Sequence, residues 1–303
     1  MLHGRTASSM TAWQCGRHSD GNINYPGGDP SCMTKTVLIT GAASSIGQAT
    51  ARTFLDDDWQ VWATARNDDL EALADEGCKT AELDVTNARE CERVVDNLVA
   101  AEGRIDCLVN NAGYGQYGPL EDVSTVQLHE QFDVNVYGPH RLVREVLPHM
   151  REREDGTIIN LSGSSGRIAV PGSGAYAGSK FALEAMSDAL RSEVASFGVD
   201  VVLVEPGPVD SDFFERGRES PESTEQSGAY DWLYELYEET SLVGGRSIEV
   251  TPEEVALTIR DATVASNPRP RYPVGQFARI TALARHLPGR WQDAGVAILR
   301  KFV

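Results

Sequence analysis

Tyr176 and Lys180, four residues apart, are the pair in this chain best suited to chemistry. On a helix, residues with this spacing lie on one face, one turn apart. An ammonium group beside a phenol favours the phenolate, so we predict that Lys180 lowers the pKa of Tyr176 from about 10 toward neutrality. Such a tyrosine can give a proton to a carbonyl oxygen or accept one from an alcohol. Chance matches to this spacing are common on solvated helices, so the pair needs support from the rest of the chain.

A glycine-rich loop precedes the first predicted helix. It reads Thr40-Gly-Ala-Ala-Ser-Ser-Ile-Gly47 and follows a short apolar run at 37–40, which predicts a buried strand. Glycines at a strand-to-helix turn let the backbone approach a pyrophosphate, which then lies at the helix N-terminus. An isolated loop of this kind is often only a tight turn, but its place after the first strand indicates dinucleotide binding.

The elements that must position these residues alternate along the chain. Strands are predicted at 37–40, 61–64, 81–84, 105–109, 157–161 and 199–204, and helices at 46–56, 70–74, 88–101, 124–150 and 175–197. Alternation with short connections predicts a parallel sheet that is covered by helices on both faces. The predicted fold class is therefore α/β, a doubly wound parallel sheet in a single domain over residues 33–275.

The composition limits the partners. The chain has 303 residues with 45 acidic and 27 basic side chains, a formal charge of -18. Nucleic acid and anionic membranes need positive surface, so we predict neither as a partner. Only Lys35, Lys79, Lys180 and Lys301 are lysines. Acidic excess with few lysines is typical of a halophilic cytoplasm, with an ordinary acidic protein as the alternative.

Three segments differ from the alternating pattern. Residues 1–32 lack apolar periodicity, so we predict a disordered N-terminal extension, with Met33 as an alternative translation start. Residues 212–250 are predicted to form a substrate lid or, alternatively, a helix packed on the surface. Residues 276–303 are predicted to be a basic helical tail. It could touch a membrane or an anionic ligand, but we favour packing on the acidic body.

Cysteines and histidines suggest no further chemistry. The five cysteines show no CxxC spacing, which is typical of reduced thiols in a cytoplasmic protein. The six histidines show neither HxxxH nor HExxH spacing, so no metal is predicted.

The motifs occur in an order that resembles the short-chain dehydrogenase/reductase family over residues 34–275. The markers are the loop at 40–47, Asp84-Val85, Asn110-Asn-Ala-Gly113, Asn135, Tyr176 with Lys180, and Pro206-Gly207. Stretches 113–120, 178–183 and 205–208 resemble its hydroxysteroid-dehydrogenase-like branch. The resemblance implies a Rossmann-like fold, an oxidoreductase of alcohols and carbonyl compounds, and a homodimer or homotetramer.

The resemblance also implies a role for each motif. Tyr176 is the acid/base, Lys180 also holds the nicotinamide ribose, and Asn135 interrupts its helix to hold a water in a proton relay. Asp84 and Val85 contact adenine. The other implied cofactor-binding residues are Gly41, Ser44, Ser45, Ile46, Gly47, Asn110, Asn111, Ala112, Gly113, Pro206, Gly207, Val209 and Ser211.

The end of the second strand predicts the cofactor. NAD enzymes of this fold have an acidic residue there, which binds the ribose hydroxyls. This chain has Ala65 followed by Arg66, which could pair with a 2'-phosphate. We therefore predict NADP, with NAD as the alternative.

Two residues depart from the family pattern. Ser45 stands where a third glycine is usual, and its hydroxyl could crowd the pyrophosphate or bond to it. Counting back thirteen residues from Tyr176, to the usual place of the catalytic serine, leads to Gly163. We predict that Ser162 or Ser164 supplies the hydroxyl.

The leading interpretation is an NADP-dependent oxidoreductase of moderately apolar alcohols and ketones. A non-catalytic dinucleotide-binding sensor or scaffold is the main alternative, supported by Gly163 and Ser45. A sugar-nucleotide epimerase fits less well, because the larger substrate domain of those enzymes is missing.

Overall fold

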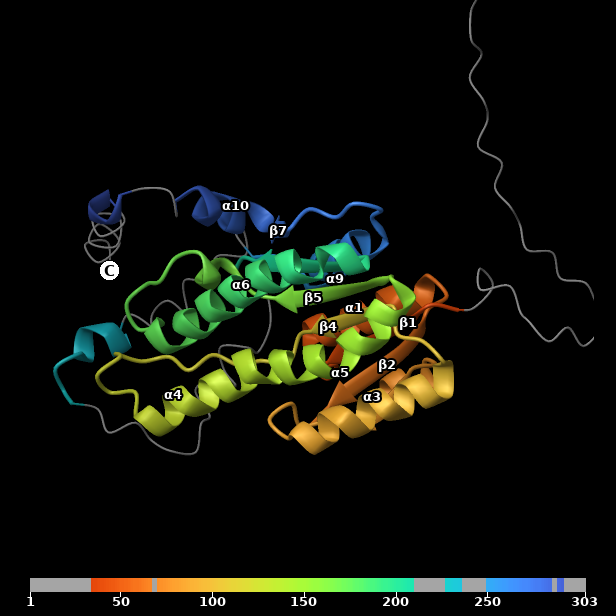
Figure 1. Ribbon diagram of the computed structural model, residues 1–303. Helices are drawn as coiled ribbons and strands as arrows, with labels where there is room; N and C mark the ends of the chain where they lie inside the picture. Colours follow the sequence, from red (N-terminus) through yellow and green to blue (C-terminus); the bar gives the residue numbers. More distant parts are fainter. Residues whose placement is uncertain (1–33, 67–69, 210–226, 236–248, 285–287, 292–303) are drawn as a thin grey trace, which may run out of the picture. The chain divides into compact units, whose positions relative to one another are not determined.

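In the part of the chain that the structure describes, seven strands form one parallel sheet (Figure 1). The computed structural model describes residues 34–66, 70–209, 227–235, 249–284 and 288–291. The strands are β1 (Thr36–Thr40), β2 (Gln60–Ala65), β3 (Lys79–Glu82), β4 (Cys107–Asn110), β5 (Gly156–Leu161), β6 (Val199–Pro206) and β7 (Arg271–Val274). Their order is β3-β2-β1-β4-β5-β6-β7, and every neighbouring pair is parallel.

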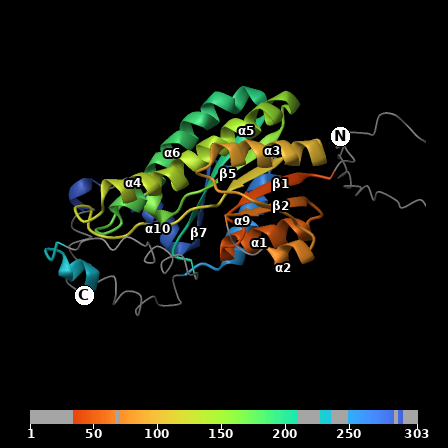
Figure 2. The same ribbon diagram turned by 90° about the horizontal axis from the view of Figure 1, so that it is seen from below.

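Helices cover both faces of this sheet, which is why its central strands are buried along their whole length. All residues of β1, β4 and β5 are buried. One face packs against α1 (Ser45–Asp56), α2 (Glu71–Asp75) and α9 (Pro252–Val264). The other packs against α3 (Ala88–Glu102), α5 (Gly138–Arg153) and α6 (Gly174–Val194), as Figure 2 shows. The predicted Rossmann-like, doubly wound α/β fold is confirmed.

The long helix predicted at 124–150 is divided by a π-helical turn. α4 (Thr125–Phe132) begins with a capping box between Ser124 and Gln127. The π-helical turn η2 (Asp133–Tyr137) follows, and α5 continues from it. A single π turn re-aims side chains within a helix. Here it contains Asn135, at the interruption that the family resemblance implies.

The edge strands follow the sequence less clearly. β3 is predominantly exposed, and the Lys79 and Glu82 side chains at its ends are typical of an edge strand. β7 and the helix before it, α9, were not among the predicted elements. β7 is short and contains Pro273, which belongs at a sheet edge because proline cannot donate to a neighbouring strand.

The C-terminal segments are described in part. α10 (Gly275–Ala284) begins where the basic tail was predicted and packs against β6, β7 and the 3₁₀ turn η3 (Ser164–Gly166). A second 3₁₀ turn, η4 (Ala195–Phe197), follows α6. Of the predicted lid, residues 227–235 and 249–250 are described, and 231–235 are helical. The predicted N-terminal extension and the tail beyond residue 291 lie outside the described residues.

Three cysteines lie inside the fold. Burial raises the pKa of Cys78 and Cys91 to about 11, and of Cys107 to about 12, so these thiols are weak nucleophiles. Among the described residues, no group of three or more His, Cys, Asp or Glu side chains could hold a metal ion. Within the same ranges, no helix has both the length and the apolar character needed to cross a membrane.

One buried carboxylate holds the amino-terminal ends of the central strands. Asp106 is 5% exposed, and it accepts hydrogen bonds from the Thr36 amide (2.8 Å), Arg104 Nε (2.8 Å) and Arg153 Nη2 (2.6 Å). Burial alone would raise the pKa of Asp106, but Arg104, the Thr36 amide and Arg153 together lower it. The residue thus joins the start of β1 to β4 and to the end of α5.

Asp106→Asn is expected to lower the free energy of unfolding by about 3 kcal/mol, because it leaves buried donors and charges without their partner. The pKa of Asp106 is lower in the folded state than in the unfolded chain. Its stabilisation is therefore present above about pH 4 and is lost as the pH falls through the folded pKa. Denaturant unfolding at pH 7 and at pH 3 measures both effects. The control is Asp155→Asn, whose exposed carboxylate meets Arg153 at 3.3 Å; equal losses in both variants would contradict the prediction.

Candidate active site

The predicted site residues gather at the edge of the sheet formed by the carboxyl ends of β1, β4, β5 and β6. β1 leads into α1 on one face, whereas β4 leads toward α4 and α5 on the other. The connections that follow the neighbouring strands β1 and β4 therefore go to opposite faces of the sheet. In doubly wound sheets, ligands bind outside the carboxyl ends of the strands at this point.

The glycine loop lets two backbone segments approach closely. Gly41 has a φ of +64°, and a Cβ there would lie 2.8 Å from the Cα of Ala112. A Cβ on Gly47 would lie 2.4 Å from the carbonyl oxygen of Gly41. Ser44 caps α1, because its Oγ accepts a hydrogen bond from the Gly47 amide (3.1 Å). Ser45 and Ile46 are the first residues of α1.

Asn111 joins this loop to the end of β4. Its Nδ2 donates to the carbonyl oxygens of Thr40 and Gly41, both at 2.9 Å, and to Ser44 Oγ at 3.1 Å. In return, Thr40 Oγ1 accepts hydrogen bonds from the amides of Asn111 and Ala112, both at 3.0 Å. The loops after β1 and β4 are therefore one bonded unit.

Tyr176, Lys180 and Asn135 come together beside this unit. Lys180 Nζ lies 5.7 Å from the centre of the Tyr176 ring and donates to the carbonyl oxygen of Leu161 at 2.8 Å. Asn135 Nδ2 donates to the Tyr114 carbonyl (3.0 Å) and to Ser179 Oγ (3.1 Å). A Cβ on Gly113 would lie 3.1 Å from Asn135 Oδ1 and 3.8 Å from Lys180 Nζ, so the loop after β4 reaches this cluster too.

Burial governs the protonation of the Tyr176–Lys180 pair. It raises the pKa of the Tyr176 phenol, and it lowers the pKa of Lys180 to about 8 although the charge of Glu184 acts in the opposite direction. The lowered pKa predicted for Tyr176 from its neighbouring ammonium is therefore not found. The physical reason is that loss of hydration disfavours the charged form of each side chain.

The structure separates the two serines that flank Gly163. A Cβ on Gly163 would lie 4.0 Å from Tyr176 Oη, so this position faces the tyrosine hydroxyl. Its φ of +144° is one that residues with a side chain rarely adopt. Ser162 is buried and its hydroxyl lies next to Gly166, where an added Cβ would approach Ser162 Oγ to 2.4 Å. Ser164, the first residue of η3, is half-buried.

The other predicted cofactor residues lie around the same edge. Asp84 Oδ1 accepts hydrogen bonds from the amide (2.9 Å) and hydroxyl (2.8 Å) of Thr86. The Val85 side chain is buried in the core. Asn110 is also buried and donates to Asn160 Oδ1 (2.8 Å) on β5, so its side chain joins two strands.

At the end of β6, Pro206 and Gly207 are buried, and the Gly207 amide donates to the Val274 carbonyl oxygen at 3.0 Å. Val209 forms a parallel bridge with Val250. Ser211 lies outside the described residues. Arg66 is exposed directly after β2. Burial raises the pKa of the Tyr114 phenol to about 12, and the charge of Arg66 acts against this shift.

An aromatic side chain from the loop after β4 lies beside Tyr176. The Tyr117 ring lies 5.7 Å from the Tyr176 ring, centre to centre. Tyr234, in the described part of the predicted lid, donates to Asp122 Oδ2 at 2.9 Å, and Tyr230 donates to Glu121. These bonds join the segment to the loop after β4.

Sequence reasoning missed three residues that support the site. Thr40 accepts a hydrogen bond from the Asn111 amide, and Ser179 accepts one from Asn135. Glu184 acts on Lys180 through its charge. Ser179 and Glu184 had a detectable signal, because both lie within one turn of Lys180 on the same helix. The role of Thr40 could not be read from spacing, since its partners are 71 and 72 residues away.

The fold and this edge define a dinucleotide-binding type of α/β protein, and comparison with known proteins gives the family. The short-chain dehydrogenase profile matches residues 35–222. The uncharacterized oxidoreductase YbbO of Escherichia coli is 35% identical over 86% of this chain and 93% of its own length. A short-chain dehydrogenase structure from Streptomyces avermitilis has a TM-score of 0.73 and 32% identity, covering 89% of this chain and 97% of that one.

A further structure, that of ElxO with NADP bound, has a TM-score of 0.65 and 26% identity, covering 78% of this chain and 93% of that one. The chain belongs to the short-chain dehydrogenase family. It is an oxidoreductase of that family, with a fold whose solved relatives bind nicotinamide dinucleotides.

Thr40→Val is expected to lower the free energy of unfolding by about 2 kcal/mol, because two backbone amides lose their acceptor. The matched control is Thr50→Val: Thr50 is equally buried, but its hydroxyl only donates to the Ile46 carbonyl within its own helix. Denaturant unfolding of both variants measures the difference. A loss in Thr50→Val as large as that in Thr40→Val would contradict the role given to Thr40.

Proposed function

We propose that the protein is an NADP-dependent oxidoreductase that interconverts an alcohol and a ketone or aldehyde, with Tyr176 as the acid/base. The observation that carries this proposal is the burial of Tyr176, Lys180 and Asn135 together, next to the glycine loop at the carboxyl edge of the sheet. The family membership and the NADP in the ElxO structure support it.

The residues at this edge fit a dinucleotide. At Gly41 and Gly47 a Cβ would collide with neighbouring backbone, so the tight loop requires glycine at both positions. The start of α1 offers amide donors for a pyrophosphate. Asp84 and the backbone of Val85 would contact adenine, Asn111, Ala112 and Gly113 would support the middle of the cofactor, and Lys180 would hold the ribose. The residues proposed for the nicotinamide end are Pro206, Gly207, Val209 and Ser211. When bound, nicotinamide exchanges a hydride directly with the substrate carbon.

Tyr176 handles the proton. Because burial raises the pKa of its phenol, Tyr176 is protonated at neutral pH and can donate to a carbonyl oxygen during reduction. In the direction of oxidation, a positive charge on Lys180, 5.7 Å from the ring, favours removal of the phenolic proton. Asn135 is held by Tyr114 and Ser179 and would position a water between this pair and solvent.

Gly163 stands where the family usually has its catalytic serine. Of the two neighbouring serines, Ser164 is better placed than Ser162 to supply that hydroxyl. Gly163 is the position that faces Tyr176 Oη, and Ser162 is directed toward Gly166. Ser164 begins the 3₁₀ turn that follows Gly163 and is half-buried. We propose Ser164 as the second hydrogen-bond donor to the substrate oxygen.

The substrate would be a moderately apolar alcohol or ketone. Tyr117 stands beside Tyr176, and the helical segment 231–235 is joined to the loop after β4 by Tyr230 and Tyr234. These aromatic rings would form one wall of the substrate site, with residues 212–250 as its lid.

NADPH oxidation in high salt, followed by absorbance over a panel of ketones and aldehydes, tests the activity. Tyr176→Phe is expected to lower kcat by about 10³-fold or more, since no other group donates the proton. Ser164→Ala is expected to lower it by about 10²-fold. Tyr137→Phe, at a tyrosine 42% exposed, serves as the control with unchanged kcat. NADPH binding without turnover by the wild type would instead favour a non-catalytic sensor.

Arg66→Gln is expected to raise KM for NADPH by about 10- to 100-fold, because a charge-assisted hydrogen bond to the 2'-phosphate is lost. KM for NADH should not change, since NADH lacks that phosphate. The control is Arg89→Gln, at an exposed arginine on α3. A parallel change with both cofactors, or none with either, would remove Arg66 from the phosphate site.

A further inference from the structure

The helix face that carries Tyr176 and Lys180 continues with two carboxylates. Glu184 and Asp188 follow Lys180 at successive intervals of four residues along α6. Residues at this spacing adjoin one another on one side of a helix. Glu184 is only 3% exposed. A buried carboxylate is costly unless other groups compensate its charge, so its surroundings call for an explanation.

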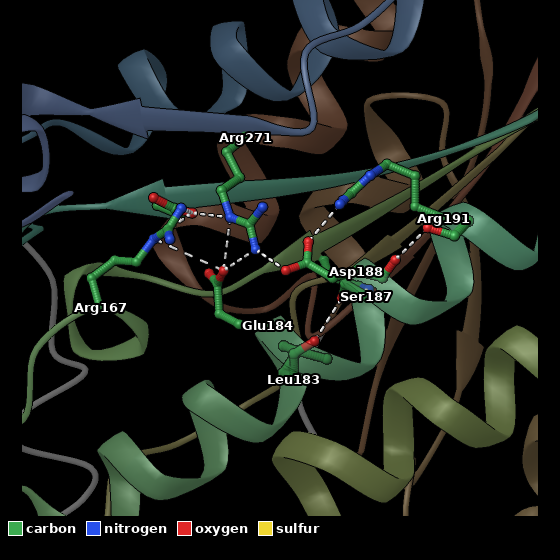
Figure 3. A network of polar contacts seen from close by, with 10 residues as sticks. Arg167, Leu183, Glu184, Ser187, Asp188, Arg191 and Arg271 are labelled. Atoms are coloured by element: carbon green, nitrogen blue, oxygen red, sulfur yellow. Dashed lines mark hydrogen bonds and ion pairs between the residues drawn. The ribbon is translucent and has the colours of Figure 1, made fainter. Parts of the chain in front are cut away.

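Two arginines surround Glu184 (Figure 3). Arg271 Nη2 lies 3.0 Å from Glu184 Oε2, and Arg167 Nε lies 3.9 Å from the same oxygen. Both arginines also contact Glu205 Oε1, Arg167 at 2.7 Å and Arg271 at 3.3 Å, and Arg271 contacts Asp188 at 2.6 Å. The cluster therefore joins α6, β6, β7 and the segment that follows η3.

The segment 162–167 lies directly against Glu184. A Cβ on Gly166 would lie 3.0 Å from Glu184 Cγ, which is tighter than most Cβ contacts, so a glycine here favours this close approach. Gly163 of the same segment faces Tyr176 Oη. Segment 162–167 therefore lies between Glu184, which it contacts at Gly166, and the proposed catalytic tyrosine, which it faces at Gly163.

Glu184 also lies one helical turn from Lys180. Both are more than nine-tenths buried, and charges at this separation interact more strongly in a protein interior than in water. Lys180 Nζ bonds to a neutral carbonyl, whereas the charge of Glu184 raises the pKa of Lys180 against the effect of burial. The pKa of Glu184 itself is raised above its ordinary value by burial and by Glu205, although Ser162, Arg167 and Arg271 act to lower it.

We infer that Glu184 is a positioning residue for the catalytic pair, whose carboxylate keeps Lys180 protonated and holds segment 162–167 against α6. This inference rests on the proposed function of Tyr176 and Lys180. It assigns the buried cluster a role in the chemistry as well as in the packing. Without the carboxylate, burial alone acts on Lys180, which then loses its proton at a lower pH.

Glu184→Gln tests the inference, because it keeps the shape of the side chain and removes the charge. The first measurement is the titration of Lys180 by NMR with ¹³C-labelled lysine, in which at most four lysines give signals. Lys180→Arg identifies the signal. The midpoint of Lys180 is expected to fall by about one pH unit or more in Glu184→Gln. The alkaline limb of the kcat–pH profile is expected to move in the same direction.

Two further variants separate charge from packing. Glu184→Asp keeps a carboxylate and should retain a midpoint closer to the wild type than Glu184→Gln, although its Tm falls. Asp188→Asn also removes a carboxylate that contacts Arg271, but its side chain is 42% exposed and one turn further from Lys180. This control should leave both the titration and the pH limb unchanged.

Each outcome decides one question. A wild-type midpoint in Glu184→Gln, with a lower Tm alone, would show that Glu184 is merely structural and overturn the inference. If Glu184→Gln does not fold, the wild type and Glu184→Asp decide: a wild-type Lys180 that is already neutral at pH 7 overturns the inference, and a midpoint near 8 that Glu184→Asp retains supports it. If Lys180 shifts as expected but the wild type reduces no carbonyl compound, the proposed function fails and the protonation role of Glu184 stands.

Discussion

The arrangement of the site depends on the burial of a polar helix face. Tyr176, Lys180 and Glu184 lie inside the protein, where loss of hydration disfavours charge on each of them. Burial alone would leave a neutral tyrosine beside a lysine that deprotonates readily. The charge of this region therefore also depends on neighbouring groups, which for Glu184 are Glu205, Ser162, Arg167 and Arg271.

The parallel sheet explains why these groups meet. Because all its strands run in one direction, the loops after β1, β4, β5 and β6 lie at one edge. Hydrogen bonds then connect several segments at this edge. Asn111 and Thr40 connect the first two, and Lys180 bonds to the last residue of β5. Because these segments are bonded to one another, movement of one would disturb its partners. This favours a single preorganised geometry of the site.

The alternation of strands and helices was readable because buried parallel strands are short apolar runs. Six strands and the helices between them were predicted within a few residues. β7 was missed because an edge strand with Pro273 lacks this pattern, and α9, which precedes it, was missed with it. The apolar periodicity gave one helix over 124–150, whereas the π turn lies at Asn135, where the family resemblance implied an interruption.

Local spacing by itself determined that Tyr176 and Lys180 share a helix face and that a glycine loop opens α1, because both are properties of a few consecutive residues. Contacts between distant segments were decided only by the tertiary structure. It placed the Ser162 hydroxyl next to Gly166 and brought Arg167 and Arg271 to Glu184. It also reversed the predicted pKa shift of Tyr176, because burial is a property of the folded molecule and not of a motif.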